Sequence, residues 1–149
     1  MDPYITEEDA DAYFAERLCT SAWDTEASSD GNRNAALVQA TRAIDRLNFA
    51  GSKTSATQER EFPRNSGTTI PTDIQYACAE VALALLDGIE PDKEIENLAL
   101  VAQGISGARS TYDRSFALEY LRNGIPTATA WAYLTPYLRD SNNLTLSRV

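Results

Sequence analysis

The stretch from Pro71 to Ile89 constrains the fold more than any other part of the chain. Its apolar residues recur at three and four positions, which is the spacing that buries one face of a helix. These residues are Ile74, Cys78, Val81, Leu85 and Ile89. Pro71 suits the start of a helix and Gly88 suits its end. Much of the remaining circumference is Ala and Leu, so the pattern favours the central helix of a core over a contact with a second subunit.

A first helix is expected over about residues 7–18. Thr6 is a good N-cap, and the acids that follow it favour a helix N-terminus. The predicted buried positions are Ala10, Tyr13, Phe14 and Leu18. Trp23 follows, in or near a polar loop at residues 25–32 that is rich in Ser, Asp and Gly.

A second helix is expected over about residues 33–48, with Gly51 marking its end. Its predicted inner face holds Leu37, Ala40, Ile44 and Leu47, and its outer face holds Gln39, Arg42 and Arg46. A short final helix at residues 127–138, broken by Pro136, completes the expected helices.

Two segments show no helical period. Residues 52–69 carry Pro63 and are mostly polar, which predicts an extended arm or a β-hairpin. Residues 98–112 contain several Gly, Ser and Thr, which predicts short strands or a hairpin. The expected fold is therefore mainly α: a helical bundle of three to four helices with a small β-hairpin or arm and an extended C-terminal tail. We expect one domain at residues 1–139 and the tail at residues 140–149.

The net charge of -9 is unevenly distributed along the chain. Residues 1–30 hold nine acids and one base, and residues 65–100 hold seven acids and one base. Residues 31–64 hold six bases and three acids, and residues 101–149 hold five bases and three acids. Such blocks favour association between copies, although the solvated faces of a monomer explain them about as well. The acidic total argues against the sequestration of nucleic acid, because phosphate binding needs a clustered basic surface.

The chain contains no His, which removes the usual general base and the commonest metal ligand. Only Cys19 and Cys78 are present, so a zinc site is not expected. Cys78 lies among apolar residues at helical spacing, which favours a reduced, packed thiol over a disulfide. No phosphate-loop or dinucleotide motif occurs, and carboxylate pairs such as Glu7 with Asp11 are more typical of helix caps than of catalysis. We therefore expect that the protein is not an enzyme and that it has no catalytic, cofactor or metal site.

Two patterns are weak signals of nucleic-acid binding. The segment from Gly104 to Gly107 has the outline of a Gly-x-x-Gly loop, but it lacks basic residues, so a turn between strands is favoured. Several aromatic residues could stack on bases as they do in single-strand binders, although their scatter is more typical of a core. They are Trp23, Phe62, Trp131, Tyr133 and Tyr137.

No apolar run approaches the ~18 residues that a membrane span needs, and the N-terminus lacks the basic and apolar stretches of a signal peptide. We expect a soluble protein that is made in a cytoplasm and has no membrane partner.

Several short motifs, taken in chain order, match one family. They are Tyr4 to Phe14, Trp23, Ala36 to Asp45 with Phe49 and Gly51, Gln58, Phe62-Pro63-Arg64, Ile70-Pro71 with Ala77, Glu80 and Ala82, and Pro136 to Leu138. Through these motifs the chain resembles phage head-tail connector or head-completion adaptor proteins, a group also labelled DnaT-like. Phe62 departs from the family pattern, where Trp is expected, and so does the segment 101–126.

The resemblance implies a dodecameric ring beneath the portal protein, joined to a downstream tail or nozzle protein. DNA would pass through its channel without sequence-specific binding, and an acidic lining would let the phosphate backbone slide. The implied location is the virion, at the portal vertex or neck, with assembly in the host cytoplasm. The residues expected at partner interfaces are Phe62, Arg64, Leu144, Leu146, Arg148 and Val149.

A single-stranded DNA-binding replication accessory protein is the alternative function. An affinity for single strands that falls steeply with salt would distinguish this function from that of a connector, which must bind a portal.

Overall fold

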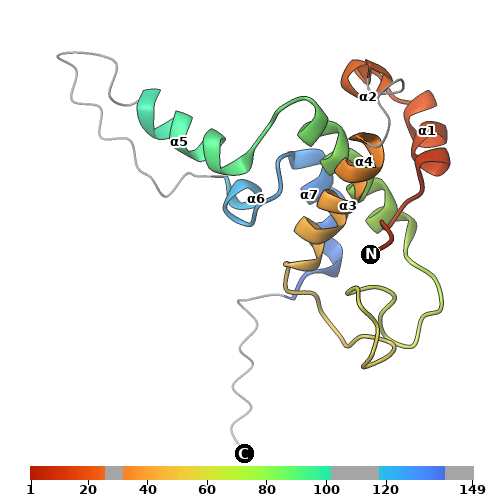
Figure 1. Cartoon of the computed structure of the whole chain (residues 1–149). Coiled ribbons are helices and arrows are strands. Elements are labelled where there is room, and N and C mark those ends of the chain that lie inside the picture. The colour runs from red at the N-terminus through yellow and green to blue at the C-terminus, as the bar shows by residue number, and fades with distance from the viewer. Residues whose placement is uncertain (26–31, 102–117, 140–149) are drawn as a thin grey trace, which may run out of the picture.

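The computed structural model describes residues 1–25, 32–101 and 118–139, which form a mainly helical structure (Figure 1). Within these ranges the elements are α1 (Glu7–Ala15), α2 (Ser21–Thr25), α3 (Asn32–Asp45), α4 (Thr72–Leu86), α5 (Pro91–Val101), α6 (Glu119–Arg122), α7 (Ala128–Leu134) and the 3₁₀ helix η3 (Thr135–Tyr137). The described residues contain no β-strand, only isolated bridges. The prediction of a mainly α fold is confirmed.

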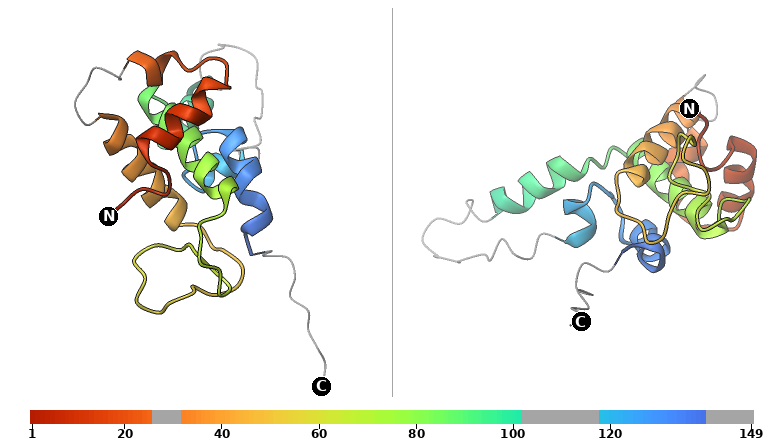
Figure 2. Two further views of the ribbon diagram at one scale, coloured as in Figure 1. Left: turned by 90° about the vertical axis from the view of Figure 1, so that its right-hand side faces the viewer. Right: turned by 90° about the horizontal axis from the view of Figure 1, so that it is seen from below.

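Helix α4 is the central helix of the core. Helix α3 packs on one side of it and α7 packs on the opposite side (Figure 2). Ile74, Cys78 and Val81 have no exposed surface, because the helix is covered by its neighbours on both sides. Gly88, at a φ of 82°, lies just beyond the end of the helix. The predictions of a central core helix, of its stop signal and of a buried free thiol at Cys78 are confirmed.

The N-terminal helix is shorter than predicted. Helix α1 begins after Thr6, whose hydroxyl oxygen accepts a first-turn backbone N–H at 3.1 Å, but it ends at Ala15. Leu18 therefore lies outside the helix and is 85% exposed, against the prediction. Trp23 lies in α2 and is buried, with its ring centroid 4.9 Å from that of Phe14. This packing holds the segment after α1 against the core, and most of the predicted loop at residues 25–32 lies outside the described residues.

Helix α3 ends at Asp45, earlier than the predicted residue 48. Its predicted inner face is confirmed, since the four apolar positions Leu37, Ala40, Ile44 and Leu47 are all buried. Gly51 does not end the helix. It lies at the base of the following loop with a φ of +76°, where a Cβ atom would meet Asn65 Oδ1 at 1.9 Å. The glycine is therefore required by the loop and not by the helix.

The segment at residues 52–69 folds back on itself and packs against the core, so it is not a free arm. An isolated antiparallel bridge between Lys53 and Arg64 joins its two limbs, but no regular hairpin strands form in it. Phe62, near its end, is 3% exposed. One buried ring therefore anchors a long polar loop.

The predicted β element at residues 98–112 is wrong over residues 98–101, which belong to helix α5. Its remaining part lies outside the described residues. Proline at the first position of α5 and the acids Asp92 and Glu94 in its first turn favour a helix. Helix α5 extends away from α4 and contacts α6 (Figure 1). The sequence pattern did not predict α6, which is a single turn.

The C-terminal helix follows its prediction. Thr127 caps α7, because its hydroxyl oxygen accepts the Ala130 N–H at 3.2 Å, and the helix passes into η3 at Pro136. The predicted tail at residues 140–149 lies outside the described residues, and the division into domain and tail stays a prediction. None of the helices described here is long and apolar enough to span a membrane.

Candidate nucleic-acid interface

Most basic side chains in the described chain are engaged within the fold. Five form ion pairs: Arg17 with Glu80, Arg33 with Asp11, Lys53 and Arg64 with Glu61, and Lys93 with Glu90. Arg60 donates to the carbonyl oxygen of Pro3 at 2.8 Å and lies over the ring of Tyr4. Side chains with such partners are poor candidates for binding an external anion.

Four exposed arginines have no side-chain partner within the described residues: Arg42, Arg46, Arg122 and Arg139. Arg42 and Arg46 are four residues apart, so they share the outer face of the C-terminal end of α3. The sequence predicted that these two point outward, and their exposure confirms it.

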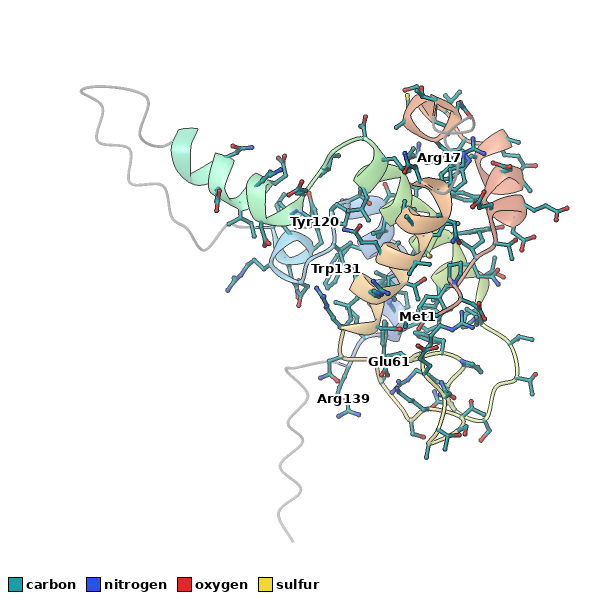
Figure 3. The ribbon with its side chains drawn as sticks, in the orientation of Figure 1. Met1, Arg17, Glu61, Tyr120, Trp131 and Arg139 are labelled. Carbon is teal, nitrogen blue, oxygen red and sulfur yellow. The ribbon has the colours of Figure 1, made fainter. Side chains whose placement is uncertain are left out.

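Arg139 joins this end of α3 from a distant part of the chain. Its backbone N–H donates to the carbonyl oxygen of Asn48 at 2.9 Å, and the preceding residue, Leu138, forms an antiparallel bridge with Phe49. Figure 3 shows Arg139 below the end of α3. No sequence signal indicated this placement, because it depends on how η3 packs. We call Arg42, Arg46 and Arg139 the arginine group.

Asp45, which precedes Arg46 in the sequence, points into the fold, and Asp140, which follows Arg139, lies outside the described residues. Asp45 Oδ1 accepts hydrogen bonds from the Tyr4 hydroxyl and from the Glu61 backbone N–H, the latter at 3.2 Å. Its Oδ2 is buried without a hydrogen-bond partner in the part of the chain described. Burial raises the pKa of this carboxyl, and the hydrogen bond from Tyr4 opposes that shift. Asp45 therefore offers no surface ion pair to its arginine neighbours.

Exposed guanidinium groups without an acidic partner are suited to bind phosphates. A guanidinium group stays charged at any physiological pH and presents several N–H donors in a plane, which match the oxygens of a phosphate. The local charge at this end of α3 is positive although the chain as a whole is acidic.

Two of the residues predicted at partner interfaces, Phe62 and Arg64, serve the fold of the described chain. The Phe62 ring is buried, with its centroid 4.8 Å from that of Phe49 and 5.8 Å from that of Tyr137. Arg64 donates to the carbonyl oxygens of Ala50 and Gly51, at 3.0 Å and 2.7 Å. Their contact with a partner stays a prediction. The other four, Leu144, Leu146, Arg148 and Val149, lie outside the described residues.

The aromatic residues that could stack on bases are mostly occupied. Trp23 and Phe62 are buried, as the core interpretation predicts. Tyr133 is partly exposed and lies edge-on to Tyr76 at 6.0 Å, and the hydroxyl of Tyr137 donates to Asp73 at 3.1 Å. These four side chains therefore have partners inside the protein.

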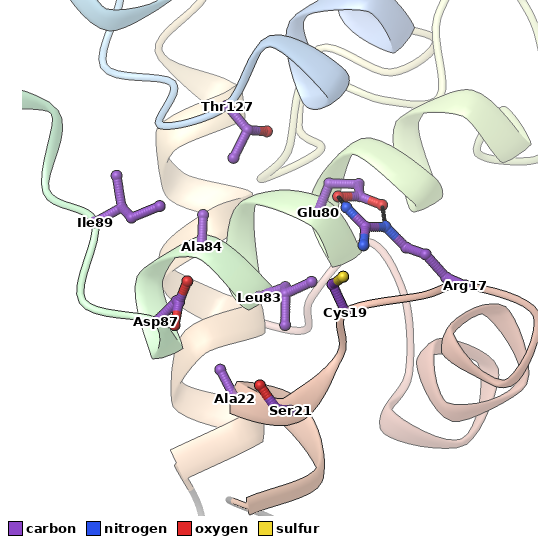
Figure 4. Close-up of a pocket in the computed structure, with 10 residues that line it drawn as sticks. All are labelled: Arg17, Cys19, Ser21, Ala22, Glu80, Leu83, Ala84, Asp87, Ile89 and Thr127. Carbon is purple, nitrogen blue, oxygen red and sulfur yellow. Dashed lines mark hydrogen bonds and ion pairs between the residues drawn. The ribbon is translucent and has the colours of Figure 1, made fainter.

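A small pocket lies beside α4, where the segment between α1 and α2 crosses it (Figure 4). Glu80 lies at its wall and is 2% exposed, so its charge needs compensation. Arg17 supplies it through two hydrogen bonds, one of them from Nη2 to Oε2 at 2.8 Å, and Tyr13 donates a third at 2.7 Å. The oxygens of Glu80 are thus used inside the fold, and the pocket presents no free charged group from this pair.

The fold and this surface define a small, mainly helical protein with an exposed group of arginines that have no partner in the described part of the chain. A family model described as "Putative DnaT-like ssDNA binding protein" matches residues 1–145. The chain therefore belongs to this family. No curated protein matches the chain, and no solved structure matches it.

The family match overturns the prediction of a phage head-tail connector. That prediction placed the chain in a dodecameric ring bound to a portal and to a tail or nozzle protein, whereas the family description names single-stranded DNA binding. The sequence motifs located the right family under its DnaT-like label, but the function attached to them was wrong. No observation tests the predicted location in a virion, which stays a prediction.

Proposed function

We propose that this protein binds single-stranded DNA and that the arginine group holds the phosphates of the strand. The observation that carries the proposal is the membership of a family described by single-stranded DNA binding. The arginine group supports it, because Arg42, Arg46 and Arg139 are exposed basic side chains without an acidic partner in the described chain.

The acidic total of the chain sets the expected strength of binding. The first turns of α1 and α5 carry acids, and α5 lies away from the C-terminal end of α3 (Figure 1). Like charges repel the strand from those regions and leave the arginine group as the favourable contact. Three phosphate contacts are few, so affinity should be modest and greatest at low ionic strength, with a slope of log K against log salt of only about -2.

The test is a titration of the full chain into fluorescently labelled oligo(dT) of about 30 nucleotides, at salt concentrations from about 50 to 200 mM. The triple variant R42E/R46E/R139E should weaken the affinity by at least about tenfold at low salt. It should also lower the slope of log K against log salt by about 2, since each single-strand phosphate contact contributes ~0.7.

Arg122→Glu is the matched control, because Arg122 is also exposed and unpaired in the described chain but lies on α6. It makes the same change of charge as any one of the three substitutions, but on α6, and should weaken binding far less than Arg42→Glu, Arg46→Glu or Arg139→Glu made singly. A wild-type chain that does not bind oligo(dT) at low salt would refute the function. A triple variant that binds like wild type would refute the site.

We further propose that the protein is not an enzyme, an expectation that rests on the absence of His and of the cofactor motifs from the sequence. Mass spectrometry of a labelled single strand after long incubation with the protein should recover the strand unchanged, and a new product would contradict this.

A further inference from the structure

Two aromatic residues differ from all the others in the described chain. Nine of its eleven aromatic residues form ring pairs, with centroids between 4.4 and 6.0 Å apart. Tyr120 and Trp131 form none, and neither side chain has a hydrogen-bond partner within the described ranges. Both are partly exposed. Their polar tips and part of their rings are therefore open to solvent or to a ligand.

The two tryptophans of the chain show the difference most clearly. Trp23 is 1% exposed, its Nε1–H donates to Asp11 at 2.7 Å, and the guanidinium group of Arg33 lies 4.7 Å from its ring centroid. Trp131 packs against the core along one part of its ring and has no ring partner or cation among the described residues. Burying aromatic area is favourable, so an indole ring that is partly exposed to water and has no partner on its exposed surface is unusual.

Trp131 is close enough to Arg139, one member of the arginine group, for one strand to reach both. From Trp131 the chain runs through the last turn of α7, through η3 and two further residues to Arg139. At the rise of these elements the two Cα atoms lie within about 20 Å of each other. In Figure 3 Tyr120 and Trp131 lie to the left of α3, and Arg139 lies below its end. Single-strand sites commonly cover several nucleotides, which span such a distance.

We propose that Trp131 stacks on a base of the bound single strand, with Tyr120 as a second stacking residue. This inference rests on the proposed function. The arginine group would hold the phosphates, and Trp131 would supply the contact that requires an unpaired base, since a base inside a duplex has no free face. Stacking would therefore make the site select single strands, which guanidinium groups alone do not do.

Tryptophan emission tests the contact directly. Wild type contains Trp23 and Trp131, and the variant W131F contains only the buried Trp23. On saturation with oligo(dT), the emission of wild type should be quenched, because a stacked base quenches an indole. The emission of W131F should stay nearly constant, although this variant retains a ring and should bind almost as well.

The affinity of W131A tests the contribution of stacking. Alanine in place of a stacking aromatic should weaken binding to oligo(dT) by about five- to 150-fold. The slope of log K against log salt should remain that of wild type, because stacking releases no counterions, whereas loss of an arginine lowers the slope. Y120A should show the same pattern with a smaller loss. Circular dichroism checks that each variant is folded, and W131F decides the question if W131A is not.

The outcomes separate this inference from the proposed function. If wild type does not bind oligo(dT), the function and the inference both fail. If wild type binds but its emission changes no more than that of W131F, the function stands and the stacking contact is refuted. Binding by W131A with wild-type affinity would refute it equally.

Discussion

Arg64 and the arginine group lie close together in the fold, and they use the same side chain in opposite ways. Arg64 donates to backbone carbonyl oxygens and forms an ion pair with Glu61, so its charge is compensated within the loop that it closes. Arg42 and Arg46 come from the same basic block of the sequence but have no partner in the described chain. The comparison shows that the net charge of a block does not locate a binding surface. A guanidinium group is available to bind a ligand only if its N–H donors have no acceptor within the protein.

The loop should therefore respond to mutation through stability, and Phe62→Ala should have the largest effect. Its ring is buried against Tyr4, Phe49 and Tyr137, so its removal leaves a cavity beneath the loop. We expect a loss of about 4 kcal/mol in the free energy of unfolding, measured by urea denaturation. Glu59→Ala, at an exposed loop position, should change it by less than about 0.5 kcal/mol. Equal effects of the two changes would show that the loop is not anchored by Phe62.

Arg17→Ala should follow, because it leaves the buried carboxylate of Glu80 without its cation. Removing one partner of a buried pair costs about 3 to 5 kcal/mol, and the lower end is expected here because Arg17 is about one-third exposed. The double variant R17A/E80Q should be more stable than R17A, since the uncompensated charge is gone. Urea denaturation of both variants measures this, and a double variant less stable than R17A would contradict it.

Gly51→Ala should cost about 1 to 2 kcal/mol. The added Cβ meets Asn65 Oδ1, and the positive φ is unfavourable for alanine. In a background of Asn65→Ala the steric clash is removed and only the cost of the left-handed backbone remains, so the effect of Gly51→Ala should become smaller. Thermal unfolding of the four proteins checks this. An unchanged effect in the Asn65→Ala background would assign the whole cost to the backbone.

Asp45 links the loop to the arginine group, and its effect should depend on pH. Because burial raises the pKa of this carboxyl above its ordinary value of 3.8, the folded state holds the proton more tightly than the unfolded state. The associated stability is fully present below that ordinary value and is lost as pH rises through the raised pKa. Wild type should therefore lose stability relative to Asp45→Asn over this rise, as measured by urea denaturation at several pH values. Parallel curves would contradict the prediction.

The sequence predicted the elements whose buried and exposed faces follow from the helical spacing of their apolar residues. The faces of α3 and α4 follow from apolar residues at spacings of three and four, and the outward position of Arg42 and Arg46 follows from the same period. Elements that depend on contacts between distant segments were not predicted. Trp23 is helical because it packs on Phe14, and Arg139 reaches α3 because Leu138 pairs with Phe49. No local pattern carries that information.

The arginine group should respond to mutation in the opposite way from the loop. Arg42→Ala, Arg46→Ala and Arg139→Ala should each change the free energy of unfolding by less than about 0.5 kcal/mol, because no described contact of their side chains is lost. The triple alanine variant should remain folded and still weaken binding to oligo(dT). Urea denaturation and the DNA titration, made on the same preparation, separate the two effects. A large loss of stability would mean that these arginines serve the fold, as Arg64 does, and the distinction between the two regions would fail.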